Sequence, residues 1–258
     1  MKTNRSSVAI VACVHGDEIA GKLVIRELNK NSFIRGRVGF FVAHPKAVAR
    51  KKRFFTQDLN RSFPGRLHGL LEERLAYVLR EKLNAYDIVL DLHATNSNIH
   101  RLAIVTGLST RVRRVLCAIP IQKVALMPKR VFGGKELVRY HRAGVSLEYG
   151  PDKSGKNYRT ILKDVYVILR NLGVIPGPRK CFPKKDLYRV FETYEVGKDI
   201  TPVPSLRDFH LIKKGQIIGR HKNGTTVASR ATFYPLFVGK GRYPKTLALM
   251  SFKKKLVL

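Results

Sequence analysis

Two histidines and a glutamate have the residue types and spacing of a metal site. His15 and Glu18 lie three positions apart directly after an apolar run, and His93 follows a second apolar run. On the first turn of a helix, side chains at this spacing face the same side, so His15 and Glu18 could reach one ion. Two histidines and one carboxylate form the open ligand set of catalytic zinc, which leaves a position for water.

The prediction of a metal site depends on the convergence of these two motifs. An H-x-x-E pattern by itself is more often a solvated helix start, and a lone buried histidine more often ends a strand. Both motifs here follow predicted strands, at 8–13 and 88–92. Ligands of open α/β sheets bind beyond the carboxyl ends of the strands, so the motifs can meet in space. Asp91 could orient one of the candidate ligands through a hydrogen bond without binding the metal itself.

Further side chains between and after these motifs could bind an anion and move a proton. Arg53 and the pair Asn60-Arg61 lie in one short segment. Arginine holds a carboxylate through two parallel hydrogen bonds, so Asn60-Arg61 predicts an anchor for an acidic substrate. Glu148 ends an apolar strand, where it could act as a general base beside a metal-bound water.

Apolar segments alternate with helical patterns, which favours an α/β fold. Apolar residues every three or four positions predict helices over 71–83 and from Ser154 to 172, before Gly173. The strands of this part are predicted at 8–13, 38–43, 88–92, 102–106, 123–127 and 145–148.

A segment with three prolines, 174–183, predicts a linker, since proline continues neither a helix nor a central strand. We therefore expect a catalytic α/β domain over 1–176 and a small C-terminal β domain over 184–258. Alternating patterns predict the strands of the second domain, with Asn223-Gly224 as a hairpin turn, at 188–196, 216–219, 225–230, 232–238 and 246–252.

The composition indicates a folded, strongly basic protein. Among 258 residues, 50 Lys and Arg face 18 Asp and Glu, a net charge of +32, and 44% of the residues are hydrophobic. This net charge produces a positive electrostatic field, which attracts anionic partners. The sign of the field does not distinguish nucleic acid, acidic membranes and small carboxylates. A general lysine and arginine bias of the source is an equally good explanation, because the basic residues are spread along the chain.

The cysteines and the apolar runs predict a cytoplasmic protein without a membrane partner. No run reaches the length of a membrane span, and the apolar run near the N-terminus is too short for a signal peptide. Three widely spaced cysteines fit unpaired thiols in a reducing compartment better than a disulfide framework: Cys13, Cys117 and Cys181.

The order of four motifs resembles the succinylglutamate desuccinylase/aspartoacylase family, which is related to zinc carboxypeptidases. The family segments G/V-x-H-G-x-E-x-x-G, D-L-N-R-x-F, D-L-H-x-T and E-x-G-P have counterparts here, in this order, over about residues 8–152. The stretch 234–238 followed by Tyr243 looks like the last β segment of the family. The resemblance implies a zinc-carboxypeptidase-like mixed sheet flanked by helices, followed by a small C-terminal β domain, with one zinc per chain.

Position by position, the resemblance also implies roles for individual residues. His15, Glu18 and His93 would bind zinc. Glu148 would be the catalytic carboxylate, and Arg53 would stabilise the developing oxyanion.

The substrate-binding residues follow from the same comparison. Asn60 and Arg61 would bind the α-carboxylate of the substrate, while Tyr243 would approach the substrate from the C-terminal domain. Aspartoacylases carry another arginine, upstream of the catalytic glutamate, for the side-chain carboxylate. The corresponding position here is Val138, so the nearby Arg139 becomes the candidate for this contact.

These observations predict a zinc-dependent amidohydrolase that cleaves the linear amide bond of a small anionic N-acyl amino acid, with an acidic amino acid expected. A carboxypeptidase-like peptidase is the alternative within the enzymes. A basic nucleic-acid-binding protein with a relic site is the other alternative, suggested by the charge and by the clusters at 50–53 and 253–255. It is not favoured, because no zinc-finger, RNP-like or helix-turn-helix pattern is present. Assembly into a homo-oligomer stays open.

Overall fold

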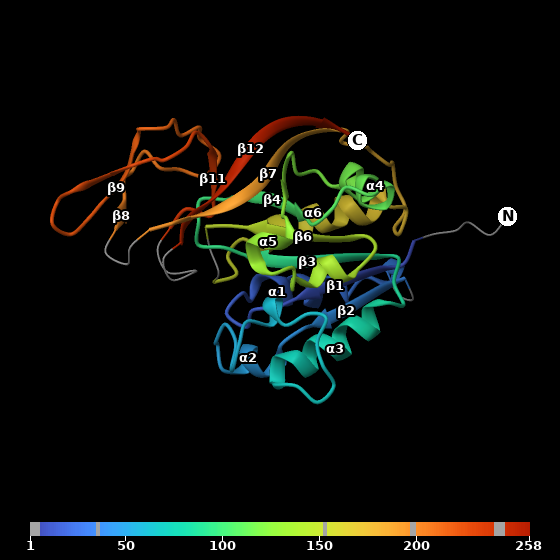
Figure 1. Cartoon of the computed structure of the whole chain (residues 1–258). Helices are drawn as coiled ribbons and strands as arrows, with labels where there is room; N and C mark the ends of the chain where they lie inside the picture. The colour runs from blue at the N-terminus through green and yellow to red at the C-terminus, as the bar shows by residue number, and fades with distance from the viewer. Residues whose placement is uncertain (1–5, 35–36, 152–153, 197–199, 240–245) are drawn as a thin grey trace.

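The computed structural model describes residues 6–34, 37–151, 154–196, 200–239 and 246–258 (Figure 1). In the described residues, a nine-stranded mixed sheet runs through the molecule in the order β11-β12-β7-β5-β4-β6-β3-β1-β2. The first six strands in chain order are β1 (Val8–Ala12), β2 (Val38–Val42), β3 (Ile88–Ala94), β4 (Arg101–Val105), β5 (Lys123–Leu126) and β6 (Gly144–Tyr149). The last three are β7 (Lys184–Glu195), β11 (Tyr234–Leu236) and β12 (Thr246–Val257).

Helices cover both faces of this sheet. One core joins the sheet to three helices, α1 (Ala20–Leu28), α4 (Thr110–Ala118) and α6 (Tyr158–Asn171). A second core on the opposite face contains α3 (Leu71–Leu83) and the 3-10 turns η2 (Leu59–Arg61) and η3 (Leu137–Tyr140). Shorter helical segments are η1 (Ser32–Ile34), α2 (Pro45–Ala49) and α5 (Lys129–Phe132).

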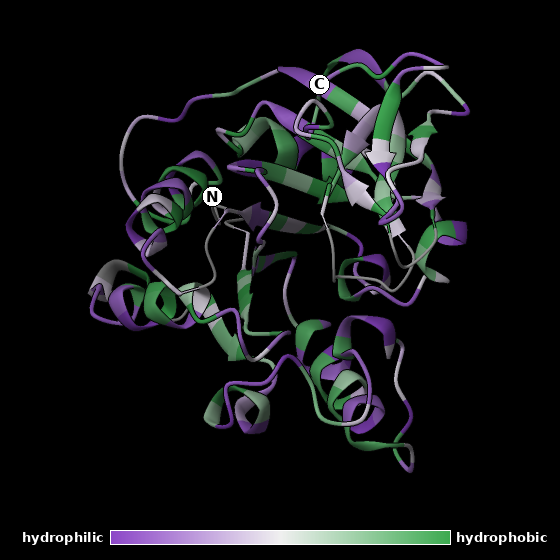
Figure 2. Cartoon of the chain, turned by 90° about the vertical axis from the view of Figure 1, so that its left-hand side faces the viewer, coloured by the Kyte–Doolittle hydropathy of each residue, from purple (hydrophilic) through white to green (hydrophobic). Residues whose placement is uncertain are grey.

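Strand β1 shows why the middle of the sheet is apolar on both faces. Val8 and Ile10 point into the first core, whereas Ala9 and Val11 point into the second. Successive side chains of a strand alternate between the faces, so a strand covered on both sides needs a continuous apolar run. Figure 2 shows apolar and polar residues interleaved along the helices, as expected for helices with one buried face.

The predicted mixed α/β class is confirmed, as are the six strands and the helix over 71–83. The second predicted helix begins later than expected, at Tyr158, with Asn157 rather than Ser154 at its N-cap. Among the described residues, no helix is both long and apolar enough to cross a membrane.

A small C-terminal β domain is the expectation over 184–258, and the described part of this segment forms strands that belong to two sheets. It does begin with a strand at Lys184, but β7, β11 and β12 extend the central sheet, because β7 pairs in parallel with β5. Only β8 (Thr201–Pro202), β9 (Ile217–Arg220) and β10 (Thr226–Ala228) form a separate small sheet, which projects from one end of the molecule in Figure 1. The two parts also share a core that includes Met127 and Leu249.

The expectation of three unpaired cysteines is wrong for two of them. Cys117, in α4, and Cys181, in the proline-rich linker, are joined by a disulfide across 64 positions. The linker returns over α4 after α6, and the amide of Phe182 donates to the carbonyl of Cys117 at 2.7 Å. Cys13 is a free, buried thiol, and burial raises its pKa to about 11.

Candidate active site

Three neighbouring strands carry the candidate residues to one edge of the sheet. β1, β3 and β6 lie side by side and run parallel, so their carboxyl ends meet there. The register between β3 and β6 places His93 opposite Glu148 and Asp91 opposite Ser146. Paired residues of adjacent strands project from the same face of a sheet, so the strand register makes His93 and Glu148 neighbours on one face.

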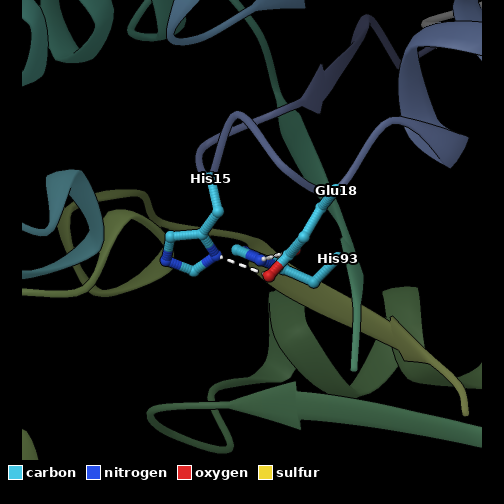
Figure 3. A group of neighbouring side chains, drawn as sticks. All are labelled: His15, Glu18 and His93. Atoms are coloured by element: carbon cyan, nitrogen blue, oxygen red, sulfur yellow. Dashed lines mark hydrogen bonds and ion pairs between the residues drawn. The ribbon is translucent and has the colours of Figure 1, made fainter. Parts of the chain in front are cut away.

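His15, Glu18 and His93 converge on one point (Figure 3). Nδ1 of His15 lies 2.8 Å from Oε1 of Glu18, and Nδ1 of His93 lies 3.0 Å from Oε2. One donor atom from each of the three residues lies within 4.8 Å of the others, and all three side chains are buried. The backbone amide of Ala94 also donates to Oε2 of Glu18 at 2.9 Å, which fixes the carboxylate.

The local structure around His15 and Glu18 differs from the expected helix start. Both residues lie in the turn that precedes α1, where the amide of Glu18 donates to the carbonyl of His15 at 3.2 Å. The glycines of this motif serve packing. A Cβ on Gly16 would lie 2.3 Å from the backbone of Ala47, and one on Gly21 would lie 2.7 Å from the side chain of Ala12. Glycine is therefore required at both positions, because any side chain would collide with neighbouring protein atoms.

The nitrogen of each histidine that faces away from the cluster is held by a second carboxylate. Nε2 of His93 lies 2.7 Å from Asp91, as the sequence suggested. Nε2 of His15 lies 3.1 Å from Asp58, a contact that sequence reasoning missed although Asp58 belongs to the D-L-N-R motif. Carboxylate–histidine pairs of this kind fix the ring and leave the other nitrogen for a metal, so the three residues fit a single metal ion.

The electrostatics of the cluster agree with this interpretation. Burial favours the neutral form of Glu18, but the charges and hydrogen bonds of His15 and His93 outweigh it and hold the pKa of Glu18 well below its usual range. Burial alone would lower the pKa of His93, but Asp91 and Glu18 raise it well above its usual range. A metal at these atoms would replace protons, so its affinity should fall as the pH falls.

Arg53 borders the cluster on one side. Its guanidinium lies 2.8 Å from Nε2 of His15 and donates to Glu18 at 3.3 Å and to Asp58 at 3.1 Å. The side chain is 22% exposed and lines the same cavity as the cluster. Arg53 therefore brings a fixed positive charge to the point where the cluster opens into the cavity.

Asn60 and Arg61 are placed next to Arg53 by the η2 turn. Asp58 caps this turn, because its carboxylate accepts the amide of Asn60 at 2.8 Å. The amide oxygen of Asn60 accepts the backbone N–H of Leu137 at 2.9 Å, which orients the side chain. Asn60 and Arg61 both line the cavity, so the expected carboxylate anchor lies beside the candidate metal ligands.

Glu148 reaches the cavity from β6. Its side chain is buried, and its Oε2 has no hydrogen-bond partner among the described residues. Glu148 and the candidate metal ligands His15 and His93 line the same cavity. A buried carboxylate oxygen with no protein donor, beside a candidate metal centre, is suited to accept a proton.

Two predicted substrate contacts remain, Arg139 and Tyr243, and the structure places only the first of them. Arg139 is not among the described residues that line the cavity; its guanidinium bonds to Glu136 at 3.0 Å and to the carbonyl of Met127 at 3.0 Å. Tyr243 lies outside the described residues. Glu136 itself lines the cavity, and sequence reasoning did not single it out.

The fold and the site define an α/β protein with a candidate single-metal centre that opens into a cavity lined by Arg53, Asn60 and Arg61. Residues 4–164 match the model of the succinylglutamate desuccinylase/aspartoacylase catalytic domain. The chain belongs to this family.

Individual relatives cover nearly the whole chain. It is 26% identical to N-acyl-aromatic-L-amino acid amidohydrolase (carboxylate-forming) A of Danio rerio, over 92% of this chain and 85% of that protein. It is 25% identical to a probable aspartoacylase of Prochlorococcus marinus, over 99% and 96% of the two chains. The crystal structure of murine aminoacylase 3 superimposes with a TM-score of 0.81 at 21% identity, over 99% of this chain and 98% of that one.

Proposed function

We propose that this protein is a zinc-dependent amidohydrolase that cleaves the linear amide bond of N-acyl amino acids. The observation that carries the proposal is the register of β3 and β6, which sets the unpartnered carboxylate oxygen of Glu148 beside His93 in a cavity that also holds Asn60 and Arg61. The relatives support the reaction class, since their names describe aspartoacylases and an N-acyl-aromatic amino acid amidohydrolase. These names leave the amino acid open.

The chain supplies most of the groups that the reaction needs. A zinc ion held by His15, Glu18 and His93 would contribute Lewis acidity and lower the pKa of water toward about 7. Glu148 accepts the proton of the attacking water and returns it to the leaving amine. Arg53 donates to the carbonyl oxygen as negative charge develops on it, an effect of about 3 kcal/mol for a single donor.

Substrate binding relies on the anchor at η2. Arg61 and Asn60 bind the α-carboxylate through charge-assisted and neutral hydrogen bonds, which holds the amide carbonyl between Arg53 and Glu148. The chain has a net charge of +32, so its electrostatic field is positive and adds to the local charge of Arg61. Anionic substrates are therefore attracted to the cavity.

The test combines metal analysis with a substrate panel. We expect about one zinc per chain, together with amine release from N-acetyl, N-formyl or N-succinyl amino acids. Activity should disappear after chelation and return when zinc is added. The matched control is Glu148→Gln, which should keep the zinc and lose the activity. A zinc-loaded protein that releases no amine from any member of the panel would overturn the proposal. So would a protein that removes C-terminal residues from peptides faster than it cleaves the N-acyl amino acids.

A further inference from the structure

A groove on the ribbon of β7 and β12 lies apart from the candidate active site. These two strands pair along their length, and they lie at the upper margin of the molecule in Figure 1. Basic and aromatic side chains line most of the groove, and none of them lines the active-site cavity: Arg130, Arg189, Phe191, Phe252 and Lys254. The proposed function therefore leaves this surface without a role.

Two phenylalanine rings form an aromatic platform in the groove. Phe191 and Phe252 are stacked, with ring centres 4.3 Å apart and ring planes inclined by 17°. Phe252 is nevertheless 51% exposed. A single exposed apolar side chain is ordinary on a protein surface, but a stacked pair in a groove offers a planar ligand a surface to stack on.

Three cations surround this aromatic platform. Arg189 lies opposite Phe252 in the register of the two strands, and Lys254 is two residues further along β12. Both side chains are exposed, and among the described residues neither forms an ion pair. Arg130 donates from Nε to the carbonyl of Phe191 at 3.0 Å, which fixes the guanidinium beside the rings. None of the described residues that line the groove is acidic, so the local field is positive.

The basic cluster at 253–255 is divided between the two faces of the ribbon. Lys253 and Lys255 lie 3.5 and 2.6 Å from the carboxylate of Asp186. Successive side chains of a strand point to opposite faces, so Lys254 projects away from this carboxylate and lines the groove. The charge of Lys254 is therefore available to an anion, whereas Asp186 partly neutralises the other two lysines.

A flexible polyanion with exposed flat rings complements this surface. Phosphate groups pair with arginine and lysine, and unpaired bases stack on aromatic side chains. A nucleic-acid duplex keeps its bases stacked inside the helix, so it cannot use the phenylalanine platform. A flat acidic bilayer meets the cations but does not follow a groove to the rings. Unpaired RNA presents both its phosphates and the faces of its bases.

We propose that the groove of Arg130, Arg189, Phe191, Phe252 and Lys254 binds single-stranded RNA. A base stacks on Phe252, and the flanking phosphates bind the three cations through charge-assisted hydrogen bonds. Preference for one base over another is weak, since every base has a face that can stack. This binding function is additional to the proposed hydrolysis and uses none of its residues.

The experiment measures binding of the full chain to a fluorescein-labelled twelve-nucleotide oligouridine by fluorescence anisotropy, at about 0.1 M salt. We expect a Kd in the micromolar range. The same strand annealed to oligoadenine should bind at least about tenfold more weakly, because its bases are paired and unavailable for stacking. Absence of binding to the single strand would overturn the inference, as would an equally tight duplex.

Two variants of Phe252 test the stacking. Phe252→Leu keeps an apolar side chain but removes the ring, so affinity for oligouridine should fall about tenfold, as expected for the loss of one stacked base. Phe252→Trp should bind at least as well as the wild type. An unchanged affinity in Phe252→Leu would refute the stacking. Vesicles of phosphatidylcholine and phosphatidylserine test a lipid occupant: tighter binding to vesicles than to oligouridine, retained in Phe252→Leu, would assign the groove to a membrane and overturn the inference.

A pair of charge variants separates the groove from the general positive charge. Arg189→Gln combined with Lys254→Gln removes two phosphate contacts, so the slope of log affinity against log salt should become shallower by about 1.4. Lys82→Gln combined with Lys163→Gln is the matched control, because these lysines are exposed on α3 and α6 and carry the same total charge. The control should leave the slope unchanged. Equal changes in both double variants would show binding by net charge alone and would overturn the inference.

Discussion

Two buried histidine–glutamate pairs in this molecule look alike but differ in what surrounds them. His93 and Glu18 form one pair, at 3.0 Å. His44 and Glu72 form the other, at 3.1 Å, with both side chains fully buried. Distance and burial therefore do not separate a candidate metal centre from a structural contact.

The remaining atoms of each pair make the distinction. His44 uses its other nitrogen to accept the amide of Ala47 at the start of α2. Glu72 accepts the amides of Phe55 and Thr56 and the hydroxyl of Thr56, so it fixes the segment that leads to η2. Both ring nitrogens of His44 and both carboxylate oxygens of Glu72 thus bond to protein atoms. Neither residue is among those that line the cavity.

The pair of His93 and Glu18 shows the opposite pattern. Asp91 holds the outer nitrogen of His93, and Glu18 faces a second histidine, His15. His15 and His93 both line the cavity. A candidate metal site therefore differs from a structural contact in that its donor atoms face the cavity, while a second carboxylate bonds to the far nitrogen of each histidine.

Alanine at the two histidines should give opposite results. His93→Ala removes a metal ligand, so bound zinc should fall from about one per chain to near zero and hydrolysis to background. His44→Ala removes one of four hydrogen bonds to the buried Glu72 carboxylate, so it should cost about 1–3 kcal/mol of the free energy of unfolding while zinc content is retained. Metal analysis and urea unfolding check the two outcomes. A fully active His93→Ala protein would refute the metal assignment.

Glu148→Gln should separate catalysis from metal binding. The amide cannot accept the proton of water, so kcat should fall by about 100- to 10,000-fold. Zinc content should stay near one per chain, because Glu148 is not one of the three candidate ligands. It lies opposite His93 on the adjacent strand. Parallel metal analysis and turnover measurements test this. Loss of zinc together with activity would instead make Glu148 a ligand.

Asp91→Asn should weaken the metal site without abolishing it. The neutral amide no longer stabilises the ring of His93, so zinc affinity should fall by about 10- to 100-fold. Competition with a chromophoric chelator measures the dissociation constant. Ser146→Ala is the graded control, since Ser146 only donates to Asp91 at 3.1 Å and should have a smaller effect. An unchanged affinity in Asp91→Asn would make this contact purely structural.

Glu72→Gln should change stability in a pH-dependent way. Burial favours the neutral carboxyl, but hydrogen bonds from Thr56, Phe55 and His44 outweigh it and lower the pKa of Glu72 from 4.5 to about 2. The folded-state pKa is depressed, so the contribution is complete above about pH 4.5 and is lost as the pH falls toward 2. The difference between wild type and variant, about 2 kcal/mol at pH 7, should shrink over this window.

Urea unfolding of both proteins at a series of pH values measures that difference. Zinc content of Glu72→Gln should remain near one per chain, in contrast to His93→Ala. A constant stability difference from pH 7 down to pH 3 would show that the carboxylate charge of Glu72 is not what stabilises the segment at 55–56.

Local sequence patterns predicted much of the fold and part of the site. Apolar runs located the central strands, and the spacing of leucines located α3, because a buried face imposes its period on the chain. His15 and Glu18 could be proposed because they follow the end of β1, and His93 because it lies at the end of β3, where Asp91 precedes it in the same strand. Asp58 was missed even though it lies beside Asn60, since a single acid in a motif does not reveal that it faces His15.

The α/β class, the order of the motifs and the residue types at the strand ends can be inferred from the amino-acid sequence, because they follow from short-range periodicity and from polar residues placed after apolar runs. Three other features become visible in the folded chain: β7 extends the central sheet, Cys117 bonds to Cys181, and Glu136 rather than Arg139 lines the cavity. These outcomes depend on strand register and on packing between distant segments. Neither is encoded in the spacing of neighbouring residues, so they appear only when the chain is folded.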